Sequence, residues 1–328
     1  MMKRKILLWM IGVLVGMVHP SLYSQEPLAH TFSIVAVDSV TGEIGAAVQS
    51  HWFSVGSIVT WAEAGVGAVA TQSLVNVSLG PRGLRLMREG KTPQEALEML
   101  LAEDEGRDFR QVAFIDAKGN SAAYTGSKCI AEAGHIHGKY FSVQANMMLK
   151  NTVWEAMSRA FRQSSGPLAE RMVAALEAAQ AEGGDIRGQQ SAALLVVRGK
   201  STEKIWEDRL IDLRVEDHPR AVEELKRVLQ VYRAYEHMNA GDLAIEKGDE
   251  QAALKEYGAA MKMQPENLEM KYWTAVSLVN IGRFEEALPM FREVFQADNN
   301  WRLLTPRLIP NGLLKASSAQ LEILNQLK

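Results

Sequence analysis

TFSIVAVDSVTGEIGAAV, residues 31–48, contains the strongest structural signal in the sequence. Phe32–Val37 is rich in β-branched and aromatic residues, which favour β-strands. Asp38–Glu43 has the composition of a turn, and Ile44–Val48 is apolar again. The stretch therefore predicts a β-hairpin.

Further elements follow on the C-terminal side of this hairpin. Strands are predicted at residues 57–61, 66–71, 110–116, 121–124, 140–144 and 191–197. Helices are predicted at residues 80–89, 92–101, 151–162 and 167–181. Strands, then helices, then strands again are typical of an α+β fold with packed layers, and not of alternating βαβ units.

Strand signals stop after about residue 217, and a 34-residue repeat appears. The repeat matches Gly248 with Gly282, Ala253 with Ala287, Leu254 with Leu288, and Tyr257 with Phe291. A 34-residue period with glycine, alanine and an aromatic residue in these places is typical of tetratricopeptide repeats. We expect a helical region over residues 218–328, with repeats at about 234–300, and a binding or assembly role for it. The helix at 221–238 and the tail from Trp301 are expected to cap the repeats or to dock them on the first domain.

The N-terminus has the pattern of a secretory signal peptide. Lys3, Arg4 and Lys5 are followed by the apolar run Ile6–Val18, which is too short for a comfortable membrane span. We expect cleavage after Ser24 and a periplasmic or secreted protein. The alternative is an uncleaved anchor.

Composition excludes several classes of function. Lys and Arg total 36 against 39 Asp and Glu, without a basic stripe, so the sequence predicts no nucleic-acid binding. Cys129 is the only cysteine, which excludes an intramolecular disulfide, and we expect it to be a small buried residue. Neither a zinc motif around His135 and His137 nor a phosphate-binding or dinucleotide-binding loop is present. We therefore expect no metal and no cofactor.

Five separated blocks resemble the uncharacterised DUF1028 family. They are residues 31–36, 41–43, 67–72, 144–146 and 183–194, and the similarity extends to about Asp212. The resemblance implies membership of the N-terminal-nucleophile hydrolase superfamily. It also implies a four-layer αββα sandwich over residues 31–217.

The resemblance directs attention to Thr31, which would be the catalytic nucleophile. Simple family members begin Met-Thr-Phe-Ser, so removal of Met leaves threonine at the N-terminus. A threonine hydroxyl needs an adjacent base, and a free α-amino group with a pKa of about 7.7–8.0 supplies one. In this chain, signal cleavage would leave residues 25–30 ahead of Thr31, so a second cleavage between His30 and Thr31 is required.

The remaining catalytic candidates come from the same blocks. Amides at Gln144 and Asn146 would supply an oxyanion hole. Asp38, at the end of the first strand, would orient the amine. The alternatives are that Asp38 forms the turn and that the two amides satisfy backbone groups.

Four residues are candidates for substrate binding: Asp185, Arg187, Gln72 and Ser191. Arg187 would pair with Asp185 or would bind a substrate carboxylate through its two-pronged guanidinium group. Asp185 is equally suited to end a helix.

Two functions therefore remain open. The first is an exported hydrolase of small amides or peptides that acts through Thr31. The second is a non-catalytic exported protein whose helical repeats bind a peptide or cell-envelope partner. Exposed edges of such a sandwich would also allow a homodimer.

Overall fold

The structure is a computed structural model that describes residues 28–29 and 31–327. The predicted signal peptide, residues 1–24, and its cleavage after Ser24 lie outside the described residues. The same holds for residues 25–27 and His30 of the predicted extension. Among the described residues, no helix has the length and apolar character needed to cross a membrane.

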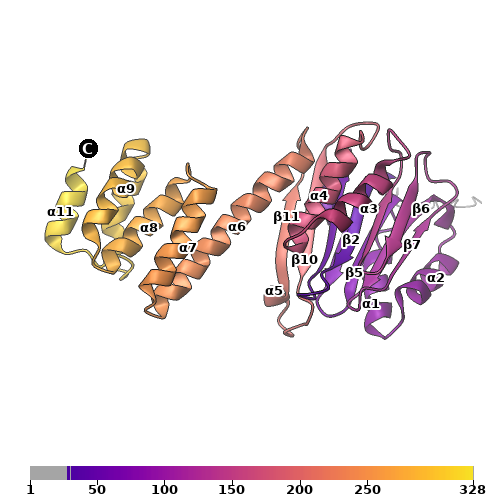
Figure 1. The fold of residues 1–328 in the computed structure, drawn as a ribbon, viewed down its shortest axis with the longest axis horizontal. Helices are drawn as coiled ribbons and strands as arrows, with labels where there is room; N and C mark the ends of the chain where they lie inside the picture. Colours follow the sequence, from indigo (N-terminus) through magenta and orange to yellow (C-terminus); the bar gives the residue numbers. More distant parts are fainter. Residues whose placement is uncertain (1–27, 30, 328) are drawn as a thin grey trace, which may run out of the picture.

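An α+β part comes first in the chain, and a helical region follows it (Figure 1). The strands are β1 (Leu28–Ala29), β2 (Thr31–Val37), β3 (Ile44–Ser50), β4 (Thr60–Glu63), β5 (Gly67–Leu74), β6 (Arg110–Asp116), β7 (Ser121–Thr125), β8 (Gly134–Gly138), β9 (Phe141–Ala145), β10 (Ser191–Val197) and β11 (Arg209–Val215). The helices of this part are η1 (Val55–Ser57), α1 (Leu79–Arg88), α2 (Pro93–Glu103), η2 (Arg107–Phe109), α3 (Val153–Gln163), α4 (Leu168–Ala181) and α5 (Ile205–Asp208). The helical region contains α6 (Ala221–Glu246), α7 (Glu250–Met263), α8 (Leu268–Asn280), α9 (Phe284–Ala297), α10 (Asn300–Leu304), η3 (Thr305–Leu308) and α11 (Ser318–Gln326). The expected α+β fold with a helical C-terminal region is confirmed.

The larger sheet has the strand order β11-β10-β3-β2-β9-β8, with antiparallel pairing throughout the described strands. The predicted hairpin of residues 31–48 forms its centre as β2 and β3. In the register of this pair, Thr31 lies opposite Ser50 and Val37 lies opposite Ile44.

Asp38 closes the turn of this hairpin. Its Oδ1 accepts the backbone N–H groups of Val40 and Thr41, each at 2.8 Å. Gly42 follows with a φ of +76°, a conformation that glycine adopts without steric cost. The turn-forming interpretation of Asp38 is therefore the one that the structure shows.

The smaller sheet has the order β1-β5-β6-β7, and β4 also pairs with β5. At one end of β5, Leu28 lies opposite Leu74 and Ala29 lies opposite Ser73. Thr31 already belongs to the larger sheet. The chain therefore passes from one sheet to the other between Ala29 and Thr31.

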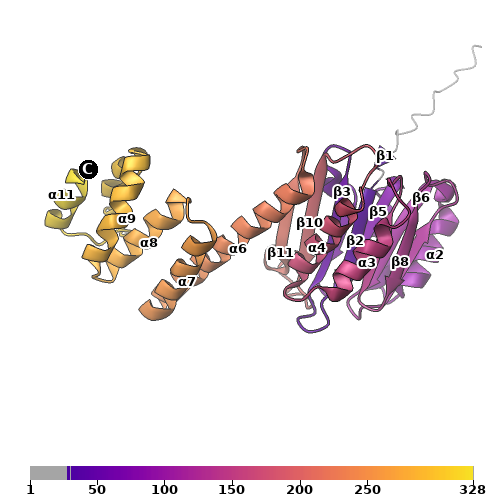
Figure 2. The ribbon, with the colours of Figure 1, turned by 45° about the horizontal axis from the view of Figure 1, so that its top comes forward.

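Helices cover the outer face of each sheet, and the two sheets face each other (Figures 1 and 2). Phe32 and Met157 belong to the core between the larger sheet and helices α3 and α4. Leu97 and Phe114 belong to the core between the smaller sheet and helices α1 and α2. Val35 belongs to a third core between the sheets. The layer order is thus helix, sheet, sheet, helix.

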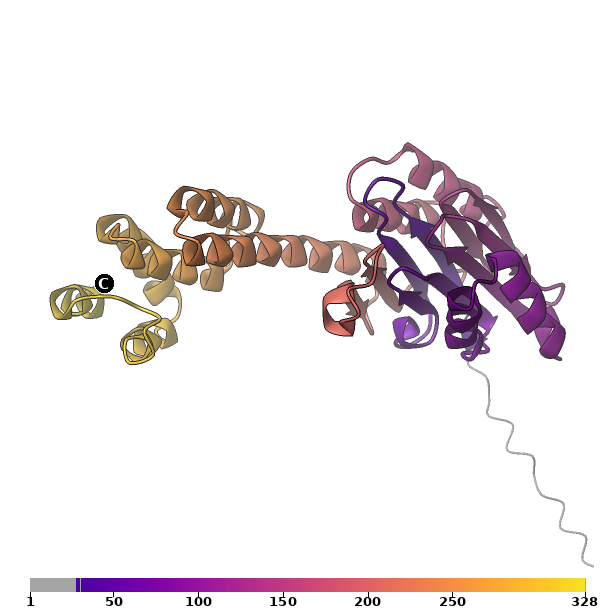
Figure 3. The same cartoon turned by 90° about the horizontal axis from the view of Figure 1, so that it is seen from below.

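Helix α6 belongs to two cores. Leu225 and Leu229, near its start, pack with the larger sheet, whereas Ala234 and Met238 pack with α7. The helix runs without a break from the α+β part into the helical region (Figures 1 and 3). The expected boundary between residues 217 and 218 precedes α6, and the first core extends beyond it to Leu229.

The 34-residue spacing corresponds to two equivalent helices. Helices α7 and α9 both contain 14 residues, and α9 begins 34 residues after α7. Gly248 and Gly282 precede them with φ values of +73° and +82°. Tyr257 and Phe291 are almost completely buried. The repeated residues therefore occupy equivalent places in two helical hairpins.

Several elements of the α+β part differ from the sequence-based expectation, and the longest of them are two strands of the larger sheet. β8 and β11 are the edge strands of the larger sheet, and neither was predicted. Their sequences, GHIHG and RLIDLRV, interrupt apolar residues with glycine, histidine or charges, which weakens the strand signal. The strand expected at residues 57–61 is found as β4 at Thr60–Glu63, and η1 at Val55–Ser57 precedes it.

Candidate functional site

A layer of buried polar side chains lies between the two sheets, at the N-terminal end of β2. Val35 of β2 packs between the sheets, whereas Phe32 and Ile34 pack against the outer helices. Because side chains alternate along a strand, Thr31 and Ser33 face the smaller sheet. The other buried polar residues of this layer are Ser50, Gln72, Gln111, Ser142, Gln144, Asn146 and Ser191.

Two amide side chains, of Gln72 and Asn146, contact the backbone carbonyl of Thr31, and a third, of Gln111, links them. Gln72 Nε2 donates to Gln111 Oε1 at 2.7 Å and to the Thr31 carbonyl oxygen at 3.2 Å. Asn146 donates its backbone N–H to the same oxygen at 3.1 Å, and its Nδ2 donates to Gln111 Oε1 at 2.9 Å. Interlinked buried amides of this kind hold one another in a fixed orientation. We call Gln72, Gln111 and Asn146 the amide cluster.

Gln144 faces the neighbouring hydroxyls. Its Nε2 donates to Ser33 Oγ at 2.5 Å, and its Oε1 accepts from Ser142 Oγ at 3.0 Å. Ser33 Oγ in turn donates to Gln72 Oε1 at 2.6 Å. The side-chain amide of Gln144 therefore supports Gln72, and it is Asn146 that lies beside Thr31.

Thr31 is completely buried in the described chain. It is the first residue of β2 and follows the crossing from β1. In this state the nitrogen of Thr31 is part of a peptide bond, because residues 28–29 precede it and pair with β5.

Asp38 does not lie near Thr31. The two residues flank opposite ends of β2, so about 20 Å of extended chain separates them. The Asp38 carboxylate contacts Arg171, at 3.2 Å. Burial raises the pKa of Asp38, but the N–H groups of Thr41 and Val40 and the charge of Arg171 bring it below its usual value overall. The expectation that Asp38 orients the Thr31 amine is therefore corrected, because the strand places it too far away.

Asp185 and Arg187 pair with each other, as expected from one of the two interpretations. Arg187 Nε lies 3.0 Å from Asp185 Oδ1, and its Nη2 lies 2.7 Å from Asp185 Oδ2. The backbone N–H of His51 also donates to Asp185, at 3.3 Å. His51 follows Ser50, the residue opposite Thr31, so the pair lies at the same end of the larger sheet. The guanidinium group of Arg187 is therefore bound to Asp185 within the protein.

Ser191 fixes the loop after β3. Its Oγ accepts the backbone N–H of Val55 at 3.0 Å and donates to the carbonyl of Trp52. Its side chain is buried. The contacts of Ser191 are therefore structural in the described chain.

Unusual backbone conformations border the amide cluster. Ser73 follows Gln72 with a φ of +76°, and Met147 follows Asn146 with a φ of +59°. Residues other than glycine rarely adopt positive φ, and such conformations cost on the order of 1–3 kcal/mol. The polypeptide thus stores strain next to two of the three amides.

Three residues of this region were not predicted to belong to the site: Gln111 of the amide cluster, and Thr125 and His135, which extend it. Gln111 Nε2 donates to Thr125 Oγ1 at 2.9 Å, and that hydroxyl lies 2.8 Å from His135 Nδ1. Gln111 had a detectable signal, because it occupies an inward position of the predicted strand at 110–116. His135 was considered only as a zinc ligand, and no signal placed it beside the cluster because strand β8 was not predicted.

His135 is expected to make stability depend on pH. Burial, and secondarily His137, lowers the pKa of His135 in the folded protein. As pH falls below about 6.5, the unfolded chain therefore takes up a proton before the folded chain does. The free energy of unfolding should decrease until pH reaches the lowered pKa. Urea unfolding between pH 7.5 and 5 should show this slope in the wild type and a shallower one in His135→Gln.

The control is His218→Gln, which removes a histidine outside the polar layer and should keep the wild-type slope. An unchanged slope in His135→Gln would assign the pH dependence to another group.

Cys129 is half-buried, and its Sγ donates to the carbonyl of Arg110 at 3.3 Å. Burial raises the pKa of the Cys129 thiol. Within residues 28–29 and 31–327, no three His, Cys, Asp or Glu side chains are grouped in a way that would hold a metal ion.

A family model described as a family of unknown function, DUF1028, matches residues 31–225. The chain belongs to the DUF1028 family. A crystal structure of a DUF1028 protein from Silicibacter pomeroyi is similar to it, with a TM-score of 0.56 and 32% sequence identity. The similarity covers 62% of this chain and 88% of that one. No curated protein matches the chain.

The DUF1028 match begins at Thr31 and ends in the first half of α6. It thus contains the whole amide cluster and both sheets apart from β1. Helices α7 to α11 of this DUF1028 protein lie outside the match.

Proposed function

We propose that this DUF1028 protein is an exported amide hydrolase of the N-terminal-nucleophile type, with Thr31 as its nucleophile. The substrate would be a small amide or a peptide. Two cleavages would mature the chain: removal of the signal peptide after Ser24, and hydrolysis of the bond between His30 and Thr31.

The position of Thr31 carries this proposal. Thr31 begins β2, faces the other sheet, and lies beside the amide cluster. Cleavage before Thr31 would also detach β1, which occupies the edge of β5 at Leu74 and Ser73. The same event would therefore create the free amine and uncover the space next to it.

The chemistry needs only one residue for nucleophile and base. The Thr31 α-amine takes the hydroxyl proton while Oγ1 attacks the carbonyl carbon of the substrate. The proton then passes to the leaving amine, and an ester remains on Thr31. Water attacks this ester, releases the acid and restores the hydroxyl.

Asn146 would stabilise the charge that develops on the substrate oxygen. Its backbone N–H is taken by the carbonyl oxygen of Thr31 at 3.1 Å, so the donor would be the Nδ2 amide, which lies 3.4 Å from that oxygen and is held next to the nucleophilic residue. Fixed donors of this kind contribute strongly to acyl transfer because they need no reorganisation. Four further residues would support this arrangement through their contacts within the protein: Gln144, Asp185, Arg187 and Ser191.

The architecture agrees with this assignment. The layer order of helix, sheet, sheet and helix is what an N-terminal-nucleophile sandwich requires. The two hairpins spaced by 34 residues fit tetratricopeptide-like repeats that would bind a protein partner.

The mature N-terminus tests the proposal. The protein is purified from its native compartment, and its N-terminus is determined by intact mass and terminal sequencing. We expect a chain that begins at Thr31 and that gains the mass of an acyl group during turnover of a slow amide substrate. A chain that begins at Gln25, or that keeps residues 1–24, contradicts the hydrolase proposal.

The second candidate is a non-catalytic exported binding protein. It is favoured by one observation: in the described chain Thr31 is fully buried, and the residues before it are paired in the sheet. An N-terminus at Gln25 would support this candidate, in which the helical region binds the partner.

A further inference from the structure

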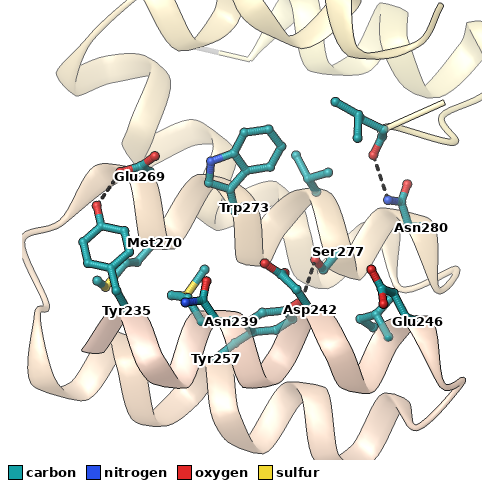
Figure 4. A pocket seen from close by; sticks show the side chains of 14 residues that line it. Tyr235, Asn239, Asp242, Glu246, Tyr257, Glu269, Met270, Trp273, Ser277 and Asn280 are labelled. Carbon is teal, nitrogen blue, oxygen red and sulfur yellow. Dashed lines mark hydrogen bonds between the residues drawn. The ribbon is translucent and has the colours of Figure 1, made fainter. Parts of the chain in front are cut away.

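A groove opens between helices α6 and α8, with α7 at its floor (Figure 4). Its volume is about 530 Å³, which lies in the range of ligand sites in proteins. Leu313 lines it from the segment after η3. The groove lies outside the DUF1028 match and apart from the amide cluster.

The sequence places one face of each helix along the groove. Helix α6 contributes Tyr235, Asn239, Asp242 and Glu246 among others, which recur every three or four residues. Such residues share one face of an α-helix. Helix α8 contributes a matching row at the same spacing, namely Glu269, Trp273, Ser277 and Asn280.

The groove is elongated. The lining residues of α6 extend from Tyr235 to Glu246, and a rise of 1.5 Å per residue gives a length of about 17 Å. An extended peptide advances about 3.3 Å per residue, so about five residues would fit along it.

The charge of the lining has a single sign. Asp242, Glu246 and Glu269 line the groove, and among the described residues no lysine, arginine or histidine does. Glu269 lies beside Tyr235 at one end, Glu246 lies at the other end, and Asp242 lies between them (Figure 4). The three carboxylates are thus distributed along the length of the groove.

Tyrosine hydroxyls hold two of these carboxylates in place. Tyr257 Oη donates to Asp242 Oδ1 at 2.8 Å, and it accepts from Ser277 Oγ at 3.2 Å. Tyr235 Oη donates to Glu269. Burial raises the pKa of Tyr257 to about 12, so this phenol remains a donor at neutral pH. Each carboxylate keeps oxygen lone pairs for a ligand.

Aromatic rings complete a surface suited to cations. Trp273 is half-buried and Tyr235 is 36% exposed. Both line the groove, from opposite helices (Figure 4). The faces of tryptophan and tyrosine rings attract ammonium and guanidinium groups, and carboxylates next to them strengthen the attraction.

We propose that this groove binds an extended basic peptide segment of a partner protein, with its lysine or arginine side chains on Asp242, Glu246 and Glu269. The spread of carboxylates over about 17 Å favours a peptide with several cations over a single amine. Asn239 at the groove would contact the peptide backbone, whereas the Asn280 amide holds the segment of Leu313 and Lys315 in place. The inference does not depend on the hydrolase proposal, because it uses no residue of the amide cluster.

Titration of the full-length protein with a fluorescently labelled peptide Lys-Ala-Lys-Ala-Lys tests the proposal. The double variant Asp242→Asn, Glu246→Gln should weaken binding about tenfold or more, since each removed charge lies in the groove. Asparagine at position 242 still accepts the hydrogen bond from Tyr257. The control Glu250→Gln, Glu266→Gln removes the same net charge from exposed positions that do not line the groove and should bind like the wild type. Thermal unfolding midpoints of all three proteins should agree.

Two further binding measurements distinguish a basic peptide from other ligands of the groove. The peptide Glu-Ala-Glu-Ala-Glu should not bind, and the free polyamine spermidine should not displace the basic peptide at equal concentration. Equal weakening in both double variants, binding of the acidic peptide, or displacement by spermidine would each overturn the proposal. A tenfold loss confined to the groove variant, at low and at moderate salt, would support it.

Discussion

Replacement of Thr31 by alanine or valine is expected to lower amide hydrolysis by about 10³–10⁶-fold, the usual loss when an essential nucleophile is removed. The physical reason is the loss of the hydroxyl that attacks the substrate. Thr31→Ser keeps the hydroxyl and the α-amine and should retain most of the activity. The measurement is turnover of an amide substrate by chains whose N-terminus at residue 31 has been verified by mass.

Valine provides the matched control for packing, because it keeps the branched shape of Thr31 at a fully buried position. Urea unfolding shows whether each variant remains folded. Equal activity of the valine variant and the wild type would exclude Thr31 as the nucleophile. The result would leave the fold assignment intact, because that rests on the layers and the family match.

Arg110→Met is expected to lower the free energy of unfolding by about 3–5 kcal/mol. Arg110 and Asp104 form an ion pair whose side chains are only 4% and 8% exposed, with Nε to Oδ2 at 2.8 Å. Arg110 Nη1 also donates to the carbonyl of Leu74 at 2.7 Å. Methionine fills much of the volume but leaves the Asp104 carboxylate buried without its cation. Urea unfolding at pH 7 measures the difference.

The pH dependence gives this prediction a second readout. Burial raises the pKa of Asp104, but the hydrogen bonds and charge of Arg110 and the hydrogen bond of Asn76 lower it overall. A lowered pKa contributes stability above the unfolded value of about 3.9, and this contribution is lost as pH falls through the folded pKa. The acid slope should therefore be shallower in Arg110→Met.

The matched control is Arg82→Met. Arg82 pairs with Glu103 at the surface, where the side chains are 35% and 61% exposed, so the change should stay within about 1 kcal/mol. Similar losses in both variants would show that burial of the Arg110 pair has no special effect on stability.

Local patterns were sufficient for much of the secondary structure. Alternation and β-branched residues predicted the central hairpin of residues 31–48. At the start of α2, Thr92 accepts the N–H of Glu95 and the Glu95 carboxylate accepts the N–H of Thr92, as the sequence Thr-Pro-Gln-Glu indicates. The 34-residue spacing located α7 and α9. The first two signals depend on near neighbours in the chain, and the third is a repeat of the sequence itself, so the sequence displays all three directly.

The candidate site was only partly predictable. The sequence placed Thr31, Asn146 and Gln72 in separate blocks of a family resemblance, and the structure brings them together. Gln111 joins them because β6 pairs with β5 in the facing sheet and places Gln111 opposite Gln72, which no local pattern expresses. Asp38 does not belong to the site, because the extended strand β2 places it at the opposite end of the sheet from Thr31.

The sequence by itself therefore determined the α+β character, the central hairpin and the helical repeat. The tertiary structure decided which polar residues share the space between the sheets, that α6 joins both cores, and that carboxylates from two helices line one groove. Periodicity fixes which face of an element is buried, since it follows from the geometry of one strand or helix. Proximity between elements depends on strand order, register and helix packing, and these are properties of the whole folded chain.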